Sequence, residues 1–168
     1  MERLSDSFFA QDALTLAPRL LGVLLCREAD GKILKMRITE TESYCGEEDT
    51  ACHAHKGKTP RTRIMYGPGG RAYIYLCYGM HHLLNVVSGP EGRPEAVLIR
   101  GVSGFDGPGK LTKALCIDKS LNGENLMDSA RLWLETDGVS FPCKATPRIG
   151  IAYATAEYRD KPWRFVAQ

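Results

Sequence analysis

Ala72-Tyr73-Ile74-Tyr75-Leu76-Cys77-Tyr78 is followed by Gly79-Met80 and then by Leu83-Leu84-Asn85-Val86-Val87-Ser88. Both apolar runs are rich in the aromatic and branched residues that favour strands, and the glycine between them favours a turn. The segment therefore predicts a β-hairpin. A further apolar run at residues 96–100 extends the hairpin to an antiparallel meander.

Three tyrosines lie close together on the first strand of this hairpin. Because successive side chains of a strand point to opposite faces, Tyr73 and Tyr75 share one face, and Tyr78 lies beside the turn on the other. Other elements can be predicted from apolar spacing, caps and turn residues. We expect one helix at 12–22, with a bend or late start at Pro18, and a second helix at 107–115. We expect further strands at 23–26, 33–44, 132–134, 149–152 and 163–166.

The predicted strand at residues 33–44 carries two acidic residues whose position is ambiguous. Residues 34, 36 and 38 are apolar and residues 35, 37 and 39 are polar, so an unbroken strand places Glu40, Glu42 and Tyr44 on the apolar face. Buried carboxylates are costly unless paired, which would indicate a site at the rim of the core. The alternative is a strand that ends near Ile38, with both acids on an exposed loop, and the pattern alone favours this alternative.

Length and composition indicate one domain with a core of its own. The 168 residues are 43% hydrophobic and 25% charged, which excludes a disordered tail or a disulfide knot. The polar N-terminus and the absence of an apolar run of about 18 residues predict a protein that is neither secreted nor in a membrane, located in the cytoplasm or nucleoid, or in the nucleus of a eukaryote. The six cysteines are irregularly spaced, which favours free thiols.

Charge is unevenly distributed along the chain. The net charge is only +2, yet residues 52–90 contain no Asp or Glu and five cations: Lys56, Lys58, Arg61, Arg63 and Arg71. Such a segment can bind nucleic-acid phosphates, or it can be an ordinary solvated face. The glycines that precede the predicted helix at 107–115 expose amides that could meet a phosphate, and the later cations Arg148, Arg159, Lys161 and Arg164 could widen the phosphate-facing surface.

Metal and cofactor chemistry has little support. Cys45, Cys52, His53 and His55 are the only cluster with ligand chemistry, and their spacing does not match a closed zinc site, so we expect no metal. Patterns of serine hydrolases and dinucleotide-binding enzymes are absent, and no cofactor is expected. A structural metal-binding protein remains as a minor alternative.

The remaining features are those that base-flipping chemistry requires. Carboxylates at Glu40 and Glu42 occur together with aromatic residues at Tyr44, Tyr75 and Tyr78, with His53, and with the acid-free basic segment. Basic groups hold a DNA backbone, aromatic rings stack on an extruded base, and an ionised group acts where the bond breaks.

Ordered motifs along nearly the whole chain resemble the alkyladenine (3-methyladenine) DNA glycosylase family. The most specific are Glu40-Thr41-Glu42-Ser43-Tyr44 and Tyr73-Ile74-Tyr75-Leu76-Cys77-Tyr78-Gly79-Met80. Further matches are residues 48–53, 59–63, 97–100, 107–111 and 161–165, and Asn85.

This resemblance implies a mixed α+β fold: a single DNA glycosylase domain over residues 1–168, with a curved antiparallel sheet, a protruding β-hairpin and short flanking helices. It implies a monofunctional enzyme without metal that excises alkylated or deaminated purines from double-stranded DNA in base excision repair. A monomer is the default expectation, since one damaged nucleotide needs one pocket and no dimer motif is evident. The substrates would be 3-methyladenine, 7-methylguanine, hypoxanthine and ethenoadenine. A non-catalytic DNA-damage binding module is the alternative, and the presence of Glu42 argues against it.

The resemblance also assigns roles to individual residues. Glu42 corresponds to the catalytic base and Arg100 to the residue that helps to position the attacking water. Tyr44, His53 and Tyr75 match residues that enclose the flipped base, and Asn85 matches one that disfavours guanine. Contacts to DNA are expected from Tyr78, which enters the duplex, from Met80 beside it, and from Thr59, Arg61, Arg63 and Lys110. The short connection at 100–107 and the end of the chain at Gln168 depart from larger relatives and are expected to reduce DNA contacts.

Overall fold

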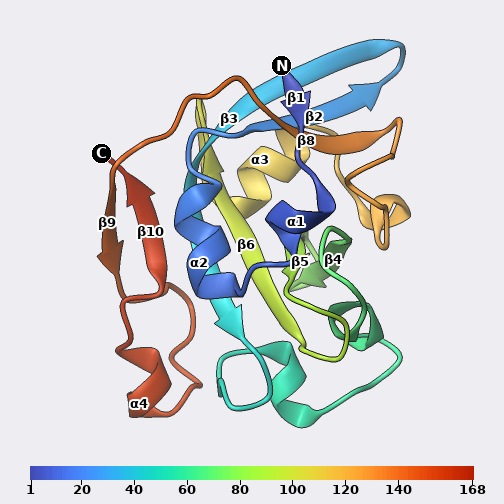
Figure 1. Ribbon diagram of the computed structural model, residues 1–168. Coiled ribbons are helices and arrows are strands. Elements are labelled where there is room, and N and C mark those ends of the chain that lie inside the picture. The colour runs from blue at the N-terminus through green and yellow to red at the C-terminus, as the bar shows by residue number, and fades with distance from the viewer.

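One long strand organises the sheet. The computed structural model describes residues 1–168. Strand β3 (Lys32–Cys45) pairs with β2 (Leu24–Ala29) along its first half and with β6 (Glu95–Val102) and β10 (Arg164–Ala167) along its second half. All these pairings are antiparallel, and β3 runs the length of the molecule (Figure 1).

Ten strands form one antiparallel sheet with short helices around it, which confirms the predicted α+β class. The strand order is β1-β8-β2-β3-β6-β5-β4, with β7, β9 and β10 paired at the side. The other strands are β1 (Glu2–Arg3), β4 (Ala72–Cys77), β5 (His81–Ser88), β7 (Phe105–Asp106), β8 (Leu132–Thr136) and β9 (Cys143–Thr146). The helices are α1 (Asp6–Phe9), α2 (Ala13–Arg19), α3 (Pro108–Ala114) and α4 (Ala156–Arg159), with 3₁₀ turns η1 (His53–Lys56), η2 (Arg63–Tyr66) and η3 (Lys119–Leu121).

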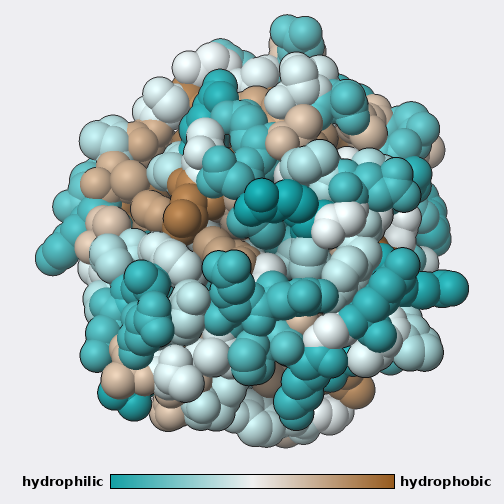
Figure 2. Space-filling model, turned by 60° about the horizontal axis from the view of Figure 1, so that its bottom comes forward, coloured by the Kyte–Doolittle hydropathy of each residue, from teal (hydrophilic) through white to brown (hydrophobic).

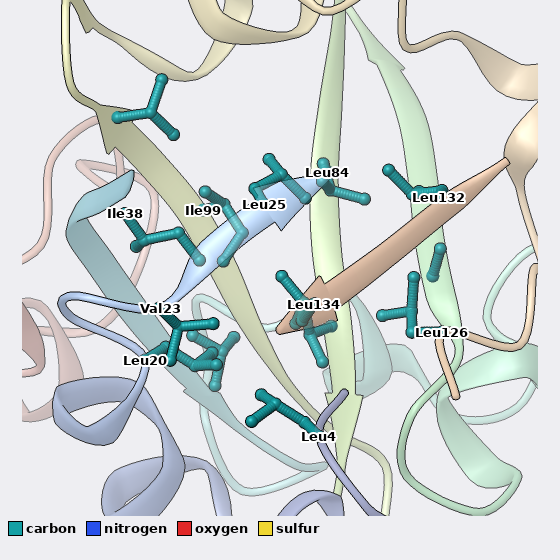
Figure 3. Packing of buried hydrophobic residues seen from close by; sticks show 14 of the residues in the cluster. Leu4, Leu20, Val23, Leu25, Ile38, Leu84, Ile99, Leu126, Leu132 and Leu134 are labelled. Atoms are coloured by element: carbon teal, nitrogen blue, oxygen red, sulfur yellow. The ribbon is translucent and has the colours of Figure 1, made fainter. Parts of the chain in front are cut away.

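The main core lies on the face of the sheet that α2 and α3 cover. Leu20, Ile38, Leu84, Ile99 and Leu134 belong to one cluster of 24 buried apolar residues, and Figure 3 shows their side chains converging from several strands. Burial of this apolar surface is the main favourable term for the fold.

Helix α2 forms where the sequence predicted a helix. The Asp12 carboxylate caps it by accepting from the Thr15 amide at 2.9 Å. Pro18 lies in its last turn, where the helix ends within two residues. Two strand hydroxyls then fix α2 to the sheet, since Thr41 donates to the Ala17 carbonyl (2.9 Å) and Ser43 to the Ala13 carbonyl (2.7 Å).

The prediction that the strand ends near Ile38 is wrong, because β3 continues to Cys45 and buries both acids. A bulge also breaks the alternation that would have placed them on the apolar face. The register there is Ile38 opposite Val102, Glu40 opposite Gly101 and Thr41 opposite Ile99. Ile38 and Thr41 therefore both face the core, and Glu40, Glu42 and Tyr44 point to the opposite face.

The opposite face of the sheet and the loops below it hold the remaining features. Residues 46–70, cyan to green in Figure 1, connect β3 to β4 below the sheet and contain η1 and η2. The predicted strand at 149–152 is wrong: these residues form a bend that leads into a turn, and the Ile149 amide donates to the carboxylate of Glu42 on β3. All six cysteines are free, and none of the helices is both long and apolar enough to cross a membrane.

Candidate active site

Glu42 is a fully buried carboxylate whose two oxygens are both held. The Tyr44 hydroxyl donates to Oε1 at 2.9 Å, and the Ile149 amide donates to Oε2 at 2.7 Å. The Arg100 guanidinium lies 3.9 Å from Oε2. Three segments distant in sequence therefore meet at this one side chain.

The ionisation of Glu42 reflects two opposing influences. Burial raises its pKa above the ordinary value, while Arg100, the Ile149 amide, the Tyr44 hydroxyl and Arg148 favour the carboxylate and limit the rise. A carboxyl group with a raised pKa beside a groove is the form in which proteins hold a general base.

Arg100 is held beside Glu42 by a second carboxylate. Its Nε donates to Glu40 at 3.1 Å, and Arg164 of β10 also donates to the same Glu40 oxygen. Arg164 is thus engaged inside the protein, and the expectation that it widens the phosphate-facing surface is wrong.

Aromatic side chains gather on the same face of the sheet. Tyr73 and Tyr75 lie on one face, as predicted, and His53 packs its ring 4.4 Å from the ring centroid of Tyr75. His53 Nδ1 shares a hydrogen bond with the Tyr73 hydroxyl at 2.9 Å. Burial and the nearby Arg61 lower the pKa of His53 to about 4, so its imidazole is neutral at physiological pH.

A groove of about 500 Å³ opens between these groups. Tyr44, His53, Tyr75 and Arg100 line it, and Tyr44 is in ring contact with none of the other aromatic residues. The volume lies within the range of about 300–1,000 Å³ that is usual for small-molecule sites. In Figure 2 hydrophilic residues cover most of the displayed face, and hydrophobic atoms gather in one recess.

A smaller cavity of about 30 Å³ continues behind the groove. Asn85 lines it at the floor, with its Nδ2 donating to the Tyr73 carbonyl at 3.2 Å. Tyr153 borders both hollows, is 69% exposed, and donates its hydroxyl to the Ala51 carbonyl at 2.7 Å. The side chains predicted to enclose a base, Tyr44, His53, Tyr75 and Asn85, therefore do lie together.

The tip of the β4–β5 hairpin is the most exposed apolar feature of the molecule. Tyr78 is 93% exposed and Met80 is 75% exposed, and Tyr78 also borders the groove. The turn is closed by the Met80 amide, which donates to the Cys77 carbonyl at 3.1 Å. A protruding hairpin at residues 72–88 was predicted, and the structure confirms it.

Two cations, Lys56 and Arg61, line a hollow that shares His53 and Tyr153 with the groove. None of Lys56, Lys58, Arg61, Arg63 and Arg71 forms an ion pair. Arg61 lies 5.4 Å from the Tyr75 ring centroid, and Lys110 at the start of α3 lines the groove from the other side. Thr59 is engaged in hydrogen bonds with Thr62. The amide of Gly107 donates to the Arg100 carbonyl at 3.1 Å, so it is not free to meet a phosphate.

The four residues considered as metal ligands do not form a common site. His53 is bound to Tyr73, and His55 Nδ1 is bound to the Glu47 carbonyl at 2.7 Å. No three His, Cys, Asp or Glu side chains are arranged to hold a metal ion.

Known proteins are similar to this chain over most of its length. A sequence model of the methylpurine-DNA glycosylase family matches residues 7–106 and 104–168. The chain belongs to this family. Similar proteins carry the provisional name 3-methyladenine DNA glycosylase. One from Psychrobacter cryohalolentis is 47% identical over 88% of this chain and 84% of its own length, and one from Natranaerobius thermophilus is 43% identical over 97% and 94%.

The methylpurine-DNA glycosylase family, as its name states, acts on DNA, and a DNA glycosylase hydrolyses the N-glycosidic bond between a base and its sugar. A third similar protein, from Nitrosococcus oceani, is 44% identical over 96% of this chain and 88% of its own length. These matches extend over almost the entire chain, so they include the hairpin, the groove and the basic loops alike.

Three residues of this methylpurine-DNA glycosylase family member were not found from sequence. Ile149 binds Glu42 through its backbone, which no side-chain pattern reveals. Tyr153 borders the groove directly after residues 149–152, which were predicted as a strand. Arg148 was expected on the phosphate-facing surface, and this expectation is wrong: its side chain is fully buried in a bidentate pair with Asp49. The acid that would have revealed this pairing lies 99 residues away.

Proposed function

We propose that this chain is a monofunctional DNA glycosylase that excises alkylated or deaminated purines from duplex DNA by base flipping and water attack at C1′. The observation that carries the proposal is the buried carboxylate of Glu42, which is held by Tyr44, Ile149 and Arg100, three residues that line the aromatic groove. Lys110 in the groove and Lys56 and Arg61 in the adjoining hollow are cations without an ion-pair partner. Membership of the methylpurine-DNA glycosylase family supports the reaction class.

For alkylated purines the chemistry requires only one carboxylate. Alkylation at N3 or N7 makes the purine cationic, so it leaves readily with little acid assistance while the sugar becomes oxocarbenium-like. Glu42 takes a proton from the attacking water and stabilises the positive charge that develops at C1′. Arg100, held by Glu40, lies beside Glu42 and helps to orient the water. No lysine nucleophile is needed, so the product is an abasic site without strand cleavage.

The aromatic residues offset the cost of extruding the nucleotide. Flipping costs a few kcal/mol, and stacking on an aromatic ring returns about 1–3 kcal/mol per base. Tyr44, His53 and Tyr75, which all line the groove, provide such surfaces. Electron-poor alkylated purines stack on electron-rich rings more favourably than normal purines do.

Two further groups complete the proposal. Asn85 at the floor of the smaller cavity disfavours normal guanine by crowding its exocyclic amino group. Tyr78 at the hairpin tip enters the duplex where the base has left, with Met80 beside it. One groove serves one damaged nucleotide, so a monomer is sufficient.

The decisive experiment uses four duplexes, each with a single 3-methyladenine, 7-methylguanine, hypoxanthine or ethenoadenine. After incubation with the protein, alkali cleaves abasic sites. We expect cleavage at the lesion of at least one duplex and none before alkali treatment. Intact strands for all four lesions would reject the proposal, and cleavage without alkali would reject its monofunctional part.

A further inference from the structure

Arg148 carries a charge that cannot contact DNA, because its side chain is fully buried. Its Nη1 donates to Asp49 at 2.6 Å and its Nη2 donates to the other Asp49 oxygen at 2.9 Å. Burying an ion pair costs a large desolvation free energy. The other contacts of the Arg148–Asp49 pair therefore indicate its role.

The pair joins three segments that carry the site. Arg148 also donates to the Ser43 carbonyl at 2.9 Å and to the Tyr158 carbonyl at 3.2 Å. Asp49 in turn accepts from the Cys45 amide at 3.0 Å and from the Ala51 amide at 3.1 Å. The end of β3, the loop that leads into η1 and the C-terminal segment are therefore fixed to one another through this pair.

Both oxygens of Glu42 depend on neighbours that Arg148 holds. Its guanidinium carbon lies 4.9 Å from the ring centroid of Tyr44, whose hydroxyl donates to Glu42. The next residue in the chain, Ile149, donates its amide to the other Glu42 oxygen. A displacement of Arg148 would thus disturb both hydrogen bonds of Glu42, although Arg148 makes no hydrogen bond to Glu42 itself.

We propose that Arg148, with Asp49, is a positioning residue that aligns Glu42 for attack by acting through Tyr44 and the Ile149 amide. The inference rests on the proposed function and adds a residue to its machinery. Partners of this kind orient the groups that do chemistry, and their loss costs about 10- to 100-fold in comparable sites.

The test measures single-turnover excision by Arg148→Met and Arg148→Lys, on whichever lesion the wild type excises. For Arg148→Met we expect a rate constant at least about 10-fold lower, with reaction amplitude unchanged for the folded fraction. Lysine keeps the charge and cannot make the bidentate pair together with both carbonyl contacts, so Arg148→Lys should also be slower, by a smaller factor. A purely structural residue would lower amplitude and thermal stability and leave the rate constant of folded molecules unchanged, which would overturn the inference.

A control variant and a double-mutant cycle complete the test. Arg37→Met is the matched control, because Arg37 makes a bidentate pair with Asp137 (3.0 and 2.9 Å) away from the groove and should retain the wild-type rate constant. In a double-mutant cycle, Tyr44→Phe should lower the excision rate constant by a smaller factor in the Arg148→Lys background than in the wild type. Additive effects would contradict action through Tyr44.

The failure of this inference can be distinguished from the failure of the proposed function. If the wild type excises no lesion, the proposed function fails. If the wild type excises a lesion and both Arg148→Met and Arg148→Lys excise it at the same rate, only this inference fails.

Discussion

At the scale of single residues, the proposed function depends on one carboxylate whose environment favours its use as a base. Desolvation raises the pKa of Glu42, and the Tyr44 hydroxyl, the Ile149 amide and the Arg100 guanidinium keep its ionised form accessible. The raised pKa makes the carboxylate of Glu42 a stronger base towards water than a solvent-exposed glutamate.

This balance predicts an acid limb in the pH profile of excision. Because Glu42 acts as the carboxylate and its pKa is raised, the rate should fall as pH decreases through a value above the ordinary 4.5 of glutamate. His53, with a pKa of about 4, stays neutral across this limb. Single-turnover excision of 7-methylguanine between about pH 4.5 and pH 9 measures the limb, since this cationic base needs no further proton to leave. A rate that is flat over the whole range would contradict the assignment.

Sequence alone identified the residues of the site whose side chains carry a pattern. Glu42, Tyr75, His53 and Asn85 were predicted together. His53 and Tyr75 line both the groove and the smaller cavity, Asn85 lines the smaller cavity, and Glu42 is buried behind Tyr44, to which it is hydrogen-bonded. Arg148 and Ile149 were not, because one acts from inside the protein through a distant acid and the other through its backbone. Tertiary pairing of this kind leaves no local periodicity to detect.

At the scale of elements, the turn of the β4–β5 hairpin holds Tyr78 in an unfavourable backbone conformation. Tyr78 has φ +51° and Gly79 has φ +66°, the signs of a type I′ turn. Glycine adopts this conformation freely, whereas tyrosine does not, and asparagine followed by glycine is the preferred sequence. A strained tyrosine at an exposed tip is consistent with a residue that is placed for contact and not for stability.

Replacing this tyrosine should separate stability from function. Tyr78→Asn should stabilise the fold by up to about 1 kcal/mol, as measured by urea denaturation. The same variant should excise a lesion from duplex DNA more slowly while excision from a single strand changes less, because the wedge is needed only where bases are stacked. Tyr78→Phe is the control that keeps the ring. Equal losses on both substrates would show that Tyr78 is not a wedge.

Strand β3 shows why element boundaries and faces could not be fully predicted. Its alternation holds up to Ile38, after which the bulge opposite Gly101 reverses the faces. A Cβ on Gly101 would lie 3.1 Å from the Cβ of Glu40, so a residue without a side chain permits the close approach of the two strands. The sequence contains the glycine, but it does not reveal which strand lies opposite.

At the scale of the whole molecule, the cations that form ion pairs and those that do not lie in different parts of the structure. Lys35, Arg37 and Arg131 are paired with acids far from the groove, whereas the five cations of residues 52–90 have no acidic partner. The segment that carries most of them lies below the sheet in Figure 1, and its Lys56 and Arg61 line a hollow that shares His53 and Tyr153 with the groove. This arrangement supports binding of a polyanion across the mouth of the groove.

This arrangement predicts a specific salt dependence of DNA binding. Arg63→Gln removes one unpaired cation from η2, so the slope of log affinity against log salt concentration should become shallower by about 0.9. Lys32→Gln, at the exposed β2–β3 turn, is a matched control and should leave the slope unchanged. Fluorescence anisotropy with a lesion duplex at several salt concentrations measures both. An unchanged slope for Arg63→Gln would remove Arg63 from the interface.

The most direct test of the account compares wild type with Glu42→Gln on the same lesion duplex, measuring affinity and single-turnover excision separately. The account predicts a rate lower by about 10²- to 10⁴-fold, with affinity for the lesion duplex nearly unchanged, because Glu42 acts on water and not on the DNA backbone. Glu42→Gln that excises at the wild-type rate would contradict the central claim, and lesion binding without excision by the wild type itself would identify a binding module instead of an enzyme.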